Sequence, residues 1–531
     1  MTKFIKTIGF IFFLNFSIMQ AQDILWEQSY GGKHAEFLYD ALPTPDYGFL
    51  LAGSSISDSN GNKTDANKGD LDYWVWKMDE KGTPEWQKSF GGNGVDLLQS
   101  VQLTSDGGFI LAGTSSSDKS GDKKENTKGK EDFWILKLDA KGNEIWQRTI
   151  GGSGQEKLLS IAQTRDGGYI LGGTSSSNKA EPDEKGVEDK YGKTADSRGS
   201  LDYWVVKLDN KGEIKWQKTM GGKYVDELKS IQQTHDKGYI LGGYSNSPIS
   251  GDKTQDNFGL NDYWIVKLDE DGKEQWQRTI GGDKDDNLFA LSQTKDGGFI
   301  VGGNSNSGAT NTKSKTNENG TDFWVLKLDK TGNIEWQQIY NYGKKDILSS
   351  IVENPDGTFL IGGYAQSEAG KDKEGINDYI ALKIKATGEE IWTQTVGSKG
   401  DEVLRKLFET RDGGYILAGT SKGQVSGDKQ SANGGSDFWV VKLKDKEKET
   451  KEKYKIEAVP NPATTYTNVI VTYEYKKGTA TLYDLNGRNL QSINLSGEKT
   501  IPMDLSNLPQ GIYVIEVKTE VSKDGVKVIK K

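Results

Sequence analysis

Short apolar segments recur along most of the chain in groups of four, separated by polar turns. In the third group, LLSIAQT (residues 158–164) precedes the turn Arg165-Asp166-Gly167-Gly168 and the segment YILGGTS. The segment DYWVVKLD then begins at Asp202, and a fourth segment carries Trp216. The second and third segments are almost continuously apolar, which is typical of β-strands covered on both faces. The pattern therefore predicts an all-β fold of four-stranded units.

This group of four occurs seven times, with a period of about 60 residues. Six of the third segments begin with Asp-aromatic-Trp, and a seventh copy, at Asp378, is degenerate. The seven aspartates are Asp72, Asp132, Asp202, Asp262, Asp322, Asp378 and Asp437. Seven units of four strands predict a seven-bladed β-propeller over residues 22–443.

The phase of the repeats predicts how the ring closes. The chain begins with a fourth-strand segment around Trp26, and the last repeat ends with the third-strand segment at Asp437. If these two segments pair, the N-terminal strand completes the last blade and protects two open edges. An open solenoid is the alternative, but it would carry a capping repeat at each end, and none is visible.

One hairpin in each unit, represented by Leu208-Asp209, Gly212 and Trp216, has the pattern KLDxxGxxxW. It resembles the tryptophan-docking repeat of pyrroloquinoline-quinone-type propellers. The resemblance covers only this hairpin, so it implies the propeller fold and no particular chemistry.

The composition changes after the repeats. Residues 444–453 are dense in charge and predict a solvated linker, and residues 454–531 return to alternating β-forming residues. Three motifs follow in order: PNPA from residue 460, LYDLNGR from residue 482 and LPQGIYV from residue 508. The residues that carry them are Pro460, Asn461, Pro462, Asp484, Asn486, Gly487, Arg488, Gly511 and Tyr513.

Together these motifs resemble the type A C-terminal sorting domain of the Bacteroidetes type IX secretion system. One departure is Val459, where the family commonly has Tyr or Phe. The resemblance implies an Ig-like β-sandwich whose partners are the outer-membrane translocon and a sortase, often with attachment of the protein to surface lipopolysaccharide. Within it, Asn486-Gly487 predicts a two-residue hairpin turn.

The N-terminus has the pattern of a signal peptide. Lys3 and Lys6 precede an apolar run, and Ala21 is a plausible cleavage point, so residues 1–21 predict Sec export to the periplasm. No later segment is long enough to span a bilayer. We therefore expect a secreted or outer-surface protein with no transmembrane segment in the mature chain.

The composition disfavours several classes of partner and of catalytic site. The formal net charge is −9, which disfavours nucleic acid as a partner. The chain has no cysteine, and its two histidines, His34 and His235, occupy unrelated repeat positions. We find no Ser-His-Asp arrangement and no phosphate loop, and we nominate no catalytic residue.

One acidic position recurs ten residues after each fourth-strand tryptophan, immediately before the innermost strand. The seven acids are Glu36, Asp96, Glu156, Asp226, Asp286, Asp346 and Glu402. This placement predicts a ring at the mouth of the central channel. A functional interpretation is a cation site or a rim for a polyhydroxylated ligand. A structural interpretation is that each acid accepts N–H groups of its own Gly-Gly turn, and recurrence in every blade favours it.

The loops between the second and third strands are long and polar, and long loops on a rigid scaffold commonly bind ligands. In the first of them, Asp58, Asn60 and Asn62 have the alternate spacing of a calcium loop, without the later glutamate of an EF-hand. Calcium is the one cofactor that the sequence suggests. We expect the third-strand aspartates to brace the ends of these loops by backbone hydrogen bonds.

The sequence favours a secreted or cell-surface recognition or adhesion propeller that binds an extracellular glycan or protein. Enzyme propellers usually diverge around one site, whereas these blades are uniform apart from a longer third loop and a degenerate sixth blade. The alternatives are a glycan hydrolase or lyase working from carboxylates near the channel, and a passive structural protein of the envelope.

Overall fold

The computed structural model describes residues 22–182, 185–317, 320–366, 376–446 and 454–531. Regular structure in these ranges is entirely β-strand, in 35 strands. Within them, no helix is long and apolar enough to cross a membrane. The predicted signal peptide and residues 447–453 of the predicted linker lie outside the described residues.

Up to Lys444, the described chain forms seven four-stranded antiparallel sheets. The first three contain β2 (Glu36–Pro43), β3 (Phe49–Ser55), β4 (Asp72–Met78) and β5 (Pro84–Phe90); β6 (Asp96–Leu103), β7 (Phe109–Ser115), β8 (Asp132–Leu138) and β9 (Glu144–Ile150); and β10 (Glu156–Gln163), β11 (Tyr169–Ser175), β12 (Asp202–Leu208) and β13 (Ile214–Met220). The next three contain β14 (Asp226–Gln233), β15 (Tyr239–Ser245), β16 (Asp262–Leu268) and β17 (Glu274–Ile280); β18 (Asp286–Gln293), β19 (Phe299–Ser305), β20 (Asp322–Leu328) and β21 (Ile334–Tyr340); and β22 (Lys345–Glu353), β23 (Phe359–Gln366), β24 (Asn377–Ile384) and β25 (Glu390–Val396). The seventh contains β26 (Glu402–Glu409), β27 (Gly414–Ser421), β28 (Asp437–Lys444) and β1 (Ile24–Tyr30).

The N-terminal strand β1 is the outermost strand of the seventh sheet. It pairs antiparallel with β28, with Trp26 opposite Lys442 and Tyr30 opposite Phe438. The indole of Trp439 also donates a hydrogen bond of 2.6 Å to a carboxylate oxygen of Glu27. The pairing expected from the phase of the repeats is therefore present, and it covers the edge of β28.

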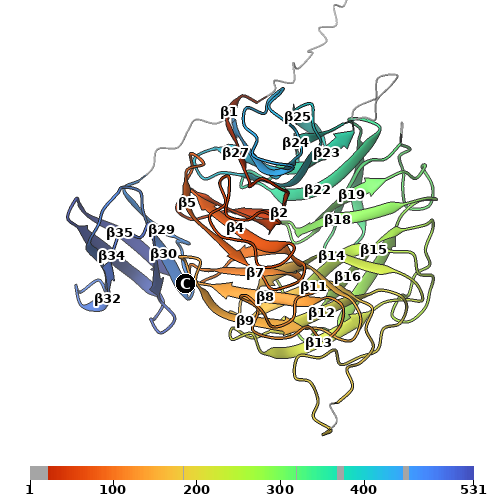
Figure 1. Ribbon diagram of the computed structural model, residues 1–531, viewed down its shortest axis with the longest axis horizontal. Helices are drawn as coiled ribbons and strands as arrows, with labels where there is room; N and C mark the ends of the chain where they lie inside the picture. Colours follow the sequence, from red (N-terminus) through yellow and green to blue (C-terminus); the bar gives the residue numbers. More distant parts are fainter. Residues whose placement is uncertain (1–21, 183–184, 318–319, 367–375, 447–453) are drawn as a thin grey trace, which may run out of the picture.

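The sheets follow one another around a common centre (Figure 1). The innermost strand β2 contacts β6, and the contacts continue through β10, β14, β18 and β22 to β26, which contacts β2 again. The fold is all-β and propeller-like.

Aromatic side chains form the core between neighbouring sheets. Tyr73 packs against Trp134 of the next sheet with ring centres 4.7 Å apart, and its hydroxyl donates to the Trp134 carbonyl at 3.0 Å. The fourth-strand Trp86 lies against Gly142, where φ is +79° and a Cβ would come within 2.9 Å of the indole. Only glycine accommodates both the positive φ and the close ring. The outer tryptophan therefore docks on the turn of the following sheet.

Residues 454–531 form a separate C-terminal unit of two sheets. Its strands are β29 (Ile456–Val459), β30 (Tyr466–Val471) and β33 (Thr500–Asp504) in one sheet, and β32 (Asn489–Leu495), β31 (Gly478–Tyr483), β34 (Gly511–Thr519) and β35 (Lys523–Lys530) in the other. Both sheets contribute to one buried cluster that includes Val469, Leu482 and Ile515.

The C-terminal unit lies beside the seven sheets (Figure 1). The guanidinium of Arg411, in the turn after β26, lies 4.4 Å from the ring centre of Tyr47 and 2.6 Å from the carboxylate of Glu457. Lys141 and Glu498 form a second ion pair of 3.1 Å between the two parts. The unit thus contacts the turns that join first to second strands and third to fourth strands.

Candidate functional site

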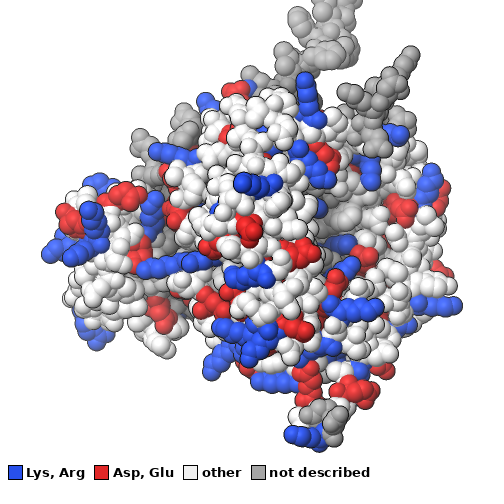
Figure 2. Space-filling view, viewed as in Figure 1, with Lys and Arg blue, Asp and Glu red and all other residues white. Residues whose placement is uncertain are grey.

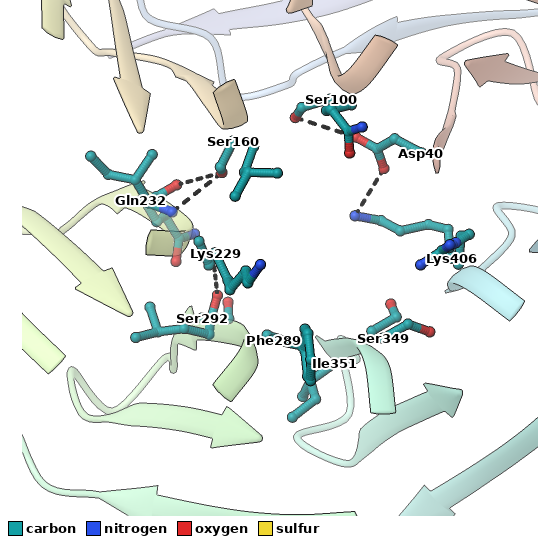
Figure 3. A pocket seen from close by; sticks show the side chains of 18 of the residues that line it. Asp40, Ser100, Ser160, Lys229, Gln232, Phe289, Ser292, Ser349, Ile351 and Lys406 are labelled. Atoms are coloured by element: carbon teal, nitrogen blue, oxygen red, sulfur yellow. Dashed lines mark hydrogen bonds and ion pairs between the residues drawn. The ribbon is translucent and has the colours of Figure 1, made fainter. Parts of the chain in front are cut away.

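A cavity of about 890 Å³ lies where the seven innermost strands meet, and every one of those strands contributes to its lining. Figure 3 shows Lys229, Phe289 and Lys406 pointing into the central space from different sheets. Its volume falls within the roughly 300–1,000 Å³ of ordinary ligand pockets. The cavity is therefore the candidate site.

The lining is built by a β-bulge in each innermost strand. In β2 the pairing with β3 skips one residue between Leu38 and Asp40, and the other six innermost strands skip the equivalent residue. A bulge redirects the unpaired side chain. The seven skipped residues all line the cavity: Tyr39, Gln99, Leu159, Lys229, Phe289, Ser349 and Arg405.

Sequence reasoning missed these residues because it weighed what the repeats share. The bulge residue lies three positions after the recurrent acid, and it is different in all seven copies. The residue before it is leucine in all seven. Comparison of the copies alone would not have singled out the bulge, because the residue directly after the acid also differs in all seven copies.

Polar groups join neighbouring innermost strands around the cavity. The carboxylate of Asp40 accepts the Val101 N–H at 3.0 Å, and the hydroxyl of Ser160 accepts the Ile231 N–H at 3.2 Å. Between the last and first strands, Lys406 forms an ion pair of 3.2 Å with Asp40 (Figure 3). The ring is thus closed at the cavity by a charged pair as well as at its outer edge by β1.

The seven recurrent acids lie elsewhere. None has exposed surface, and none lines the cavity. Each accepts a backbone N–H four residues earlier, in the turn after the preceding fourth strand. The donors are Gly32 at 2.9 Å, Gly92 at 2.8 Å, Gly152 at 2.8 Å, Gly222 at 2.6 Å, Gly282 at 2.7 Å, Tyr342 at 2.7 Å and Ser398 at 3.2 Å. A ligand rim would need exposed carboxylates, so this placement corrects the expected position at the channel mouth.

Other buried charges lie near several of the recurrent acids. Asp72, on the third strand β4, accepts the Lys68 N–H at 2.7 Å, which is the loop brace expected of that position. Lys63, from the long loop, is 2 % exposed and donates to the Ser57 carbonyl at 2.7 Å. Burial lowers the pKa of Lys63, while the carboxylates of Asp72 and Glu36 oppose that shift. Equivalent buried lysines in other sheets are Lys123, Lys193, Lys253, Lys313 and Lys429.

Burial also changes the protonation of the third-strand acids. It raises the pKa of Asp72 to about 6 and that of Asp262 to about 7, and the neighbouring carboxylates Asp96 and Asp286 add to these shifts. In the first sheet, Asp72, Glu36 and Lys63 therefore lie together with little water around them. In such a site a carboxyl group keeps its proton to a higher pH than it does in solution.

The three calcium-loop candidates each bind the backbone. Asp58 accepts the Asn67 N–H at 3.2 Å, Asn60 the Lys33 N–H at 2.5 Å, and Asn62 the Gly31 N–H at 3.3 Å. Among the described residues, no group of three or more His, Cys, Asp or Glu side chains is placed to hold a metal ion. Asn60 and Asn62 therefore hold the loop to the turn after β1, Asp58 makes a bond within the loop, and calcium stays a prediction.

The tail motifs lie at turns of the C-terminal unit. The Asn461 side chain donates to the Lys527 carbonyl at 2.7 Å and accepts the Ile529 N–H at 3.0 Å, which fastens the Pro460 to Pro462 segment to β35. The Tyr513 hydroxyl donates to the Pro509 carbonyl at 2.7 Å, close to Gly511 at the start of β34.

The hairpin between β31 and β32 differs from its prediction. The backbones of Asp484 and Arg488 are hydrogen-bonded, so three residues, and not two, form the turn. Gly487 has a φ of +79° at the left-handed position, and the Asp484 carboxylate accepts the N–H groups of Asn486 and Arg488. The aspartate selects the longer turn because it offers acceptors that a two-residue turn would leave unused.

Residues 457–531 match the family described as secretion system C-terminal sorting domain. They form a type IX sorting domain. The domain supports export by the type IX machinery and an extracellular or cell-surface location in Bacteroidetes.

A second comparison finds a more distant relative. The regulatory protein FlaEY of Caulobacter vibrioides is 25% identical over 169 residues, which is 32% of this chain and 17% of FlaEY. This chain therefore spans only a small part of FlaEY.

Among solved structures, cobalt-substituted Synechocystis ACO has a TM-score of 0.36 and 10% identity, covering 92% of this chain and 98% of that one. Puromycin hydrolase has a TM-score of 0.34 and 10% identity, covering 74% and 61%. These TM-scores are too low to establish the fold. The description of the fold given above comes from the strand pairing of this chain alone.

Proposed function

We propose that this protein is a closed seven-bladed β-propeller, exported by the type IX system, that binds an extracellular ligand in its central cavity. The lining of the cavity carries the proposal. One bulge residue from each innermost strand lines the cavity, and the seven residues are all different. The cavity therefore offers charged, amide, hydroxyl and aromatic groups in one enclosed space, which suits the recognition of a polar ligand.

The cavity favours binding over hydrolysis. Two-carboxylate glycoside hydrolysis needs a pair of carboxyl groups roughly 5–9.5 Å apart across the bond that breaks. Asp40 is the one acidic residue that lines the cavity within the described chain, and its carboxylate is paired with Lys406. The hydrolase alternative therefore lacks its second carboxylate.

We further propose that the seven buried acids are turn braces, and that the long loops extend the recognition surface. The braces hold the turn before each innermost strand and so fix where each bulge begins. The ligand class is an extracellular glycan or protein. We also propose that the sorting domain is an Ig-like sandwich, that a sortase removes it, and that the protein is then attached at the cell surface.

A blocked cavity tests the function. The full chain is screened on arrays of glycans and extracellular proteins beside Gln99→Trp, which places an indole in the cavity. Ile249→Trp is the matched control, because Ile249 is 59% exposed in a long loop. We expect Gln99→Trp to weaken binding at least about tenfold, as lost pocket contacts commonly do, and Ile249→Trp to leave it unchanged. The reverse result would move the site to the loops, and binding to neither array would favour a passive envelope protein.

A further inference from the structure

The charged side chains that line the cavity are mainly positive, although the chain as a whole has more acidic than basic residues. Acidic residues outnumber basic ones in the sequence, 77 to 68. The cavity is lined by five basic side chains and one acid: Arg165, Lys229, Lys345, Arg405, Lys406 and Asp40. On the face in Figure 2, positive and negative side chains are interspersed. The excess of positive charge in the cavity therefore contrasts with the mixed charges on this face.

Three of these cations already have partners, and one of them is Arg165, which donates to the His235 carbonyl at 2.7 Å. Lys406 pairs with Asp40 at 3.2 Å, and Lys229 pairs with Glu227 at 2.7 Å. Arg405 is different. Its guanidinium carbon lies 5.4 Å from the ring centre of Tyr39, and within the described residues no acceptor binds it. Its Nε is buried without a hydrogen bond. Because Nε is enclosed by protein, an anion in the cavity would be bound by the two terminal nitrogens, for which no acceptor is present among the described residues.

Two phenol groups share the cavity with Arg405. Tyr39 comes from the bulge of β2, and Tyr364 comes from β23. Burial raises the pKa of both hydroxyls, and the positive charge of Arg405 opposes the shift. Both hydroxyls therefore stay protonated at neutral pH, and they can donate to the same anionic group.

The rest of the lining suits a sugar. Gln99, Gln232 and Ser349 offer amide and hydroxyl groups that can hydrogen-bond to hydroxyls. Phe289, with Tyr39, offers a ring face to the C–H side of a sugar ring. A peptide would need larger apolar pockets for its side chains, and this polar lining does not supply them.

We propose that the cavity binds an anionic oligosaccharide, with Arg405 taking its carboxylate or sulfate between the hydroxyls of Tyr39 and Tyr364. A guanidinium matches the two oxygens of such a group with parallel N–H bonds. The inference rests on the proposed function, since it names the ligand class of the same cavity.

Calorimetric titration of the full chain tests the proposal. The probes are trigalacturonate, its neutral methyl ester and a sulfated galactose trisaccharide. We expect one or both anionic sugars to bind, more weakly as salt rises, and the ester to bind at least about tenfold more weakly. Arg405→Gln should lower affinity for the anionic probe roughly 10- to 100-fold, as loss of a charge-assisted bond does. Arg405→Lys should restore part of it.

Arg278→Gln is the matched control. It removes the same charge from the outer strand β17, where Arg278 donates to the Thr331 carbonyl at 2.8 Å. It should leave affinity unchanged, and thermal melting of each variant checks folding. Equal binding of the acid and the ester, an unaffected Arg405→Gln, or binding of only a peptide carboxylate would overturn the inference. If no anionic sugar binds but an array ligand is lost in Gln99→Trp, the anionic inference fails and the proposed function stands.

Discussion

Asp286 lies at the start of β18 without exposed surface, and its role can be read from two contacts. Its carboxylate accepts the Gly282 N–H at 2.7 Å and the Ser307 hydroxyl at 2.8 Å. The side chain therefore ties the turn before its strand to the loop after β19. Asp96, Glu156 and Asp226 repeat both contacts with their own turn and loop, which gives a structural reason for the recurrence of the acid.

If these acids are braces, Asp286→Ala should lower the free energy of unfolding by roughly 1–3 kcal/mol, because buried donors lose their acceptor. The loss should be the same with calcium and with a chelator. Asp271→Ala, at an exposed turn residue of the preceding sheet, is the control and should change stability by less than about 0.5 kcal/mol. A calcium-dependent rise in the melting temperature of the wild type would instead support a cation site, through the acids or through Asp58, Asn60 and Asn62.

The buried acids also predict a pH dependence. Burial raises the pKa of Asp132 and Asp262 to about 7, above the roughly 3.9 of an unfolded aspartate. Between those values the folded chain holds protons that the unfolded chain lacks, so stability falls as pH rises toward 7. Burial alone would raise the pKa of the turn residue Asp296, but hydrogen bonds from Thr294 and Lys327 lower it to about 2. That contribution is lost as pH falls through the acid range.

We therefore expect thermal melts of the full chain to show greater stability near pH 5 than near pH 7.5, with a decline again in strong acid. Asp262→Asn cannot titrate, so it should flatten the upper part of the profile. A melting temperature that rises steadily from pH 5 to pH 7.5 would contradict this account of the buried acids.

At the scale of the strand, β1 and the bulges have separate tasks. β1 gives β28 a partner and completes the seventh sheet, while the bulges turn one side chain per blade into the cavity. The outer strand β1 therefore completes the ring, and the inner strands supply the lining of the candidate site.

Deletion of residues 23–32 removes β1 and exposes the edge of β28. We expect a loss of stability beyond the roughly 0.5–3 kcal/mol of an ordinary point mutation, together with a tendency to associate through the open edge. Chemical denaturation and light scattering measure both. An unchanged denaturation midpoint would show that β1 does not close the ring.

For the whole molecule, the sorting domain sits on the turn side of the sheets through Arg411, Tyr47 and Glu457. It has its own buried cluster and contributes no strand to the seven sheets. The two parts therefore each retain a complete core if the chain is divided between them.

Deletion of residues 454–531 should leave the propeller folded but retained in the periplasm of its own host. A fluorescent reporter carrying a signal peptide and these residues should reach the outside. Cell fractionation, with the full chain as the control, measures both. Delivery of the truncated protein to the surface at the normal level would contradict the sorting role.

The sequence by itself determined the number and order of the strands in the seven repeats, the pairing of the Trp26 strand with the Asp437 strand, and the sorting tail. These features are written in local periodicity and in repetition, since apolar runs, turn glycines and motif order need no knowledge of distant contacts. It also indicated that the recurrent acids brace turns, because Asp and Glu next to Gly-Gly favour local hydrogen bonds.

Only the tertiary structure decided where the site lies. The bulge in each innermost strand depends on how that strand pairs with its neighbour, and in the sequence the bulge position is no more variable than the residue directly after the acid. Arg405, Tyr39 and Tyr364 come together because residues far apart in the chain meet when the ring closes. These residues become neighbours only when the first and last sheets meet, so no pattern within a single repeat could reveal that they lie together.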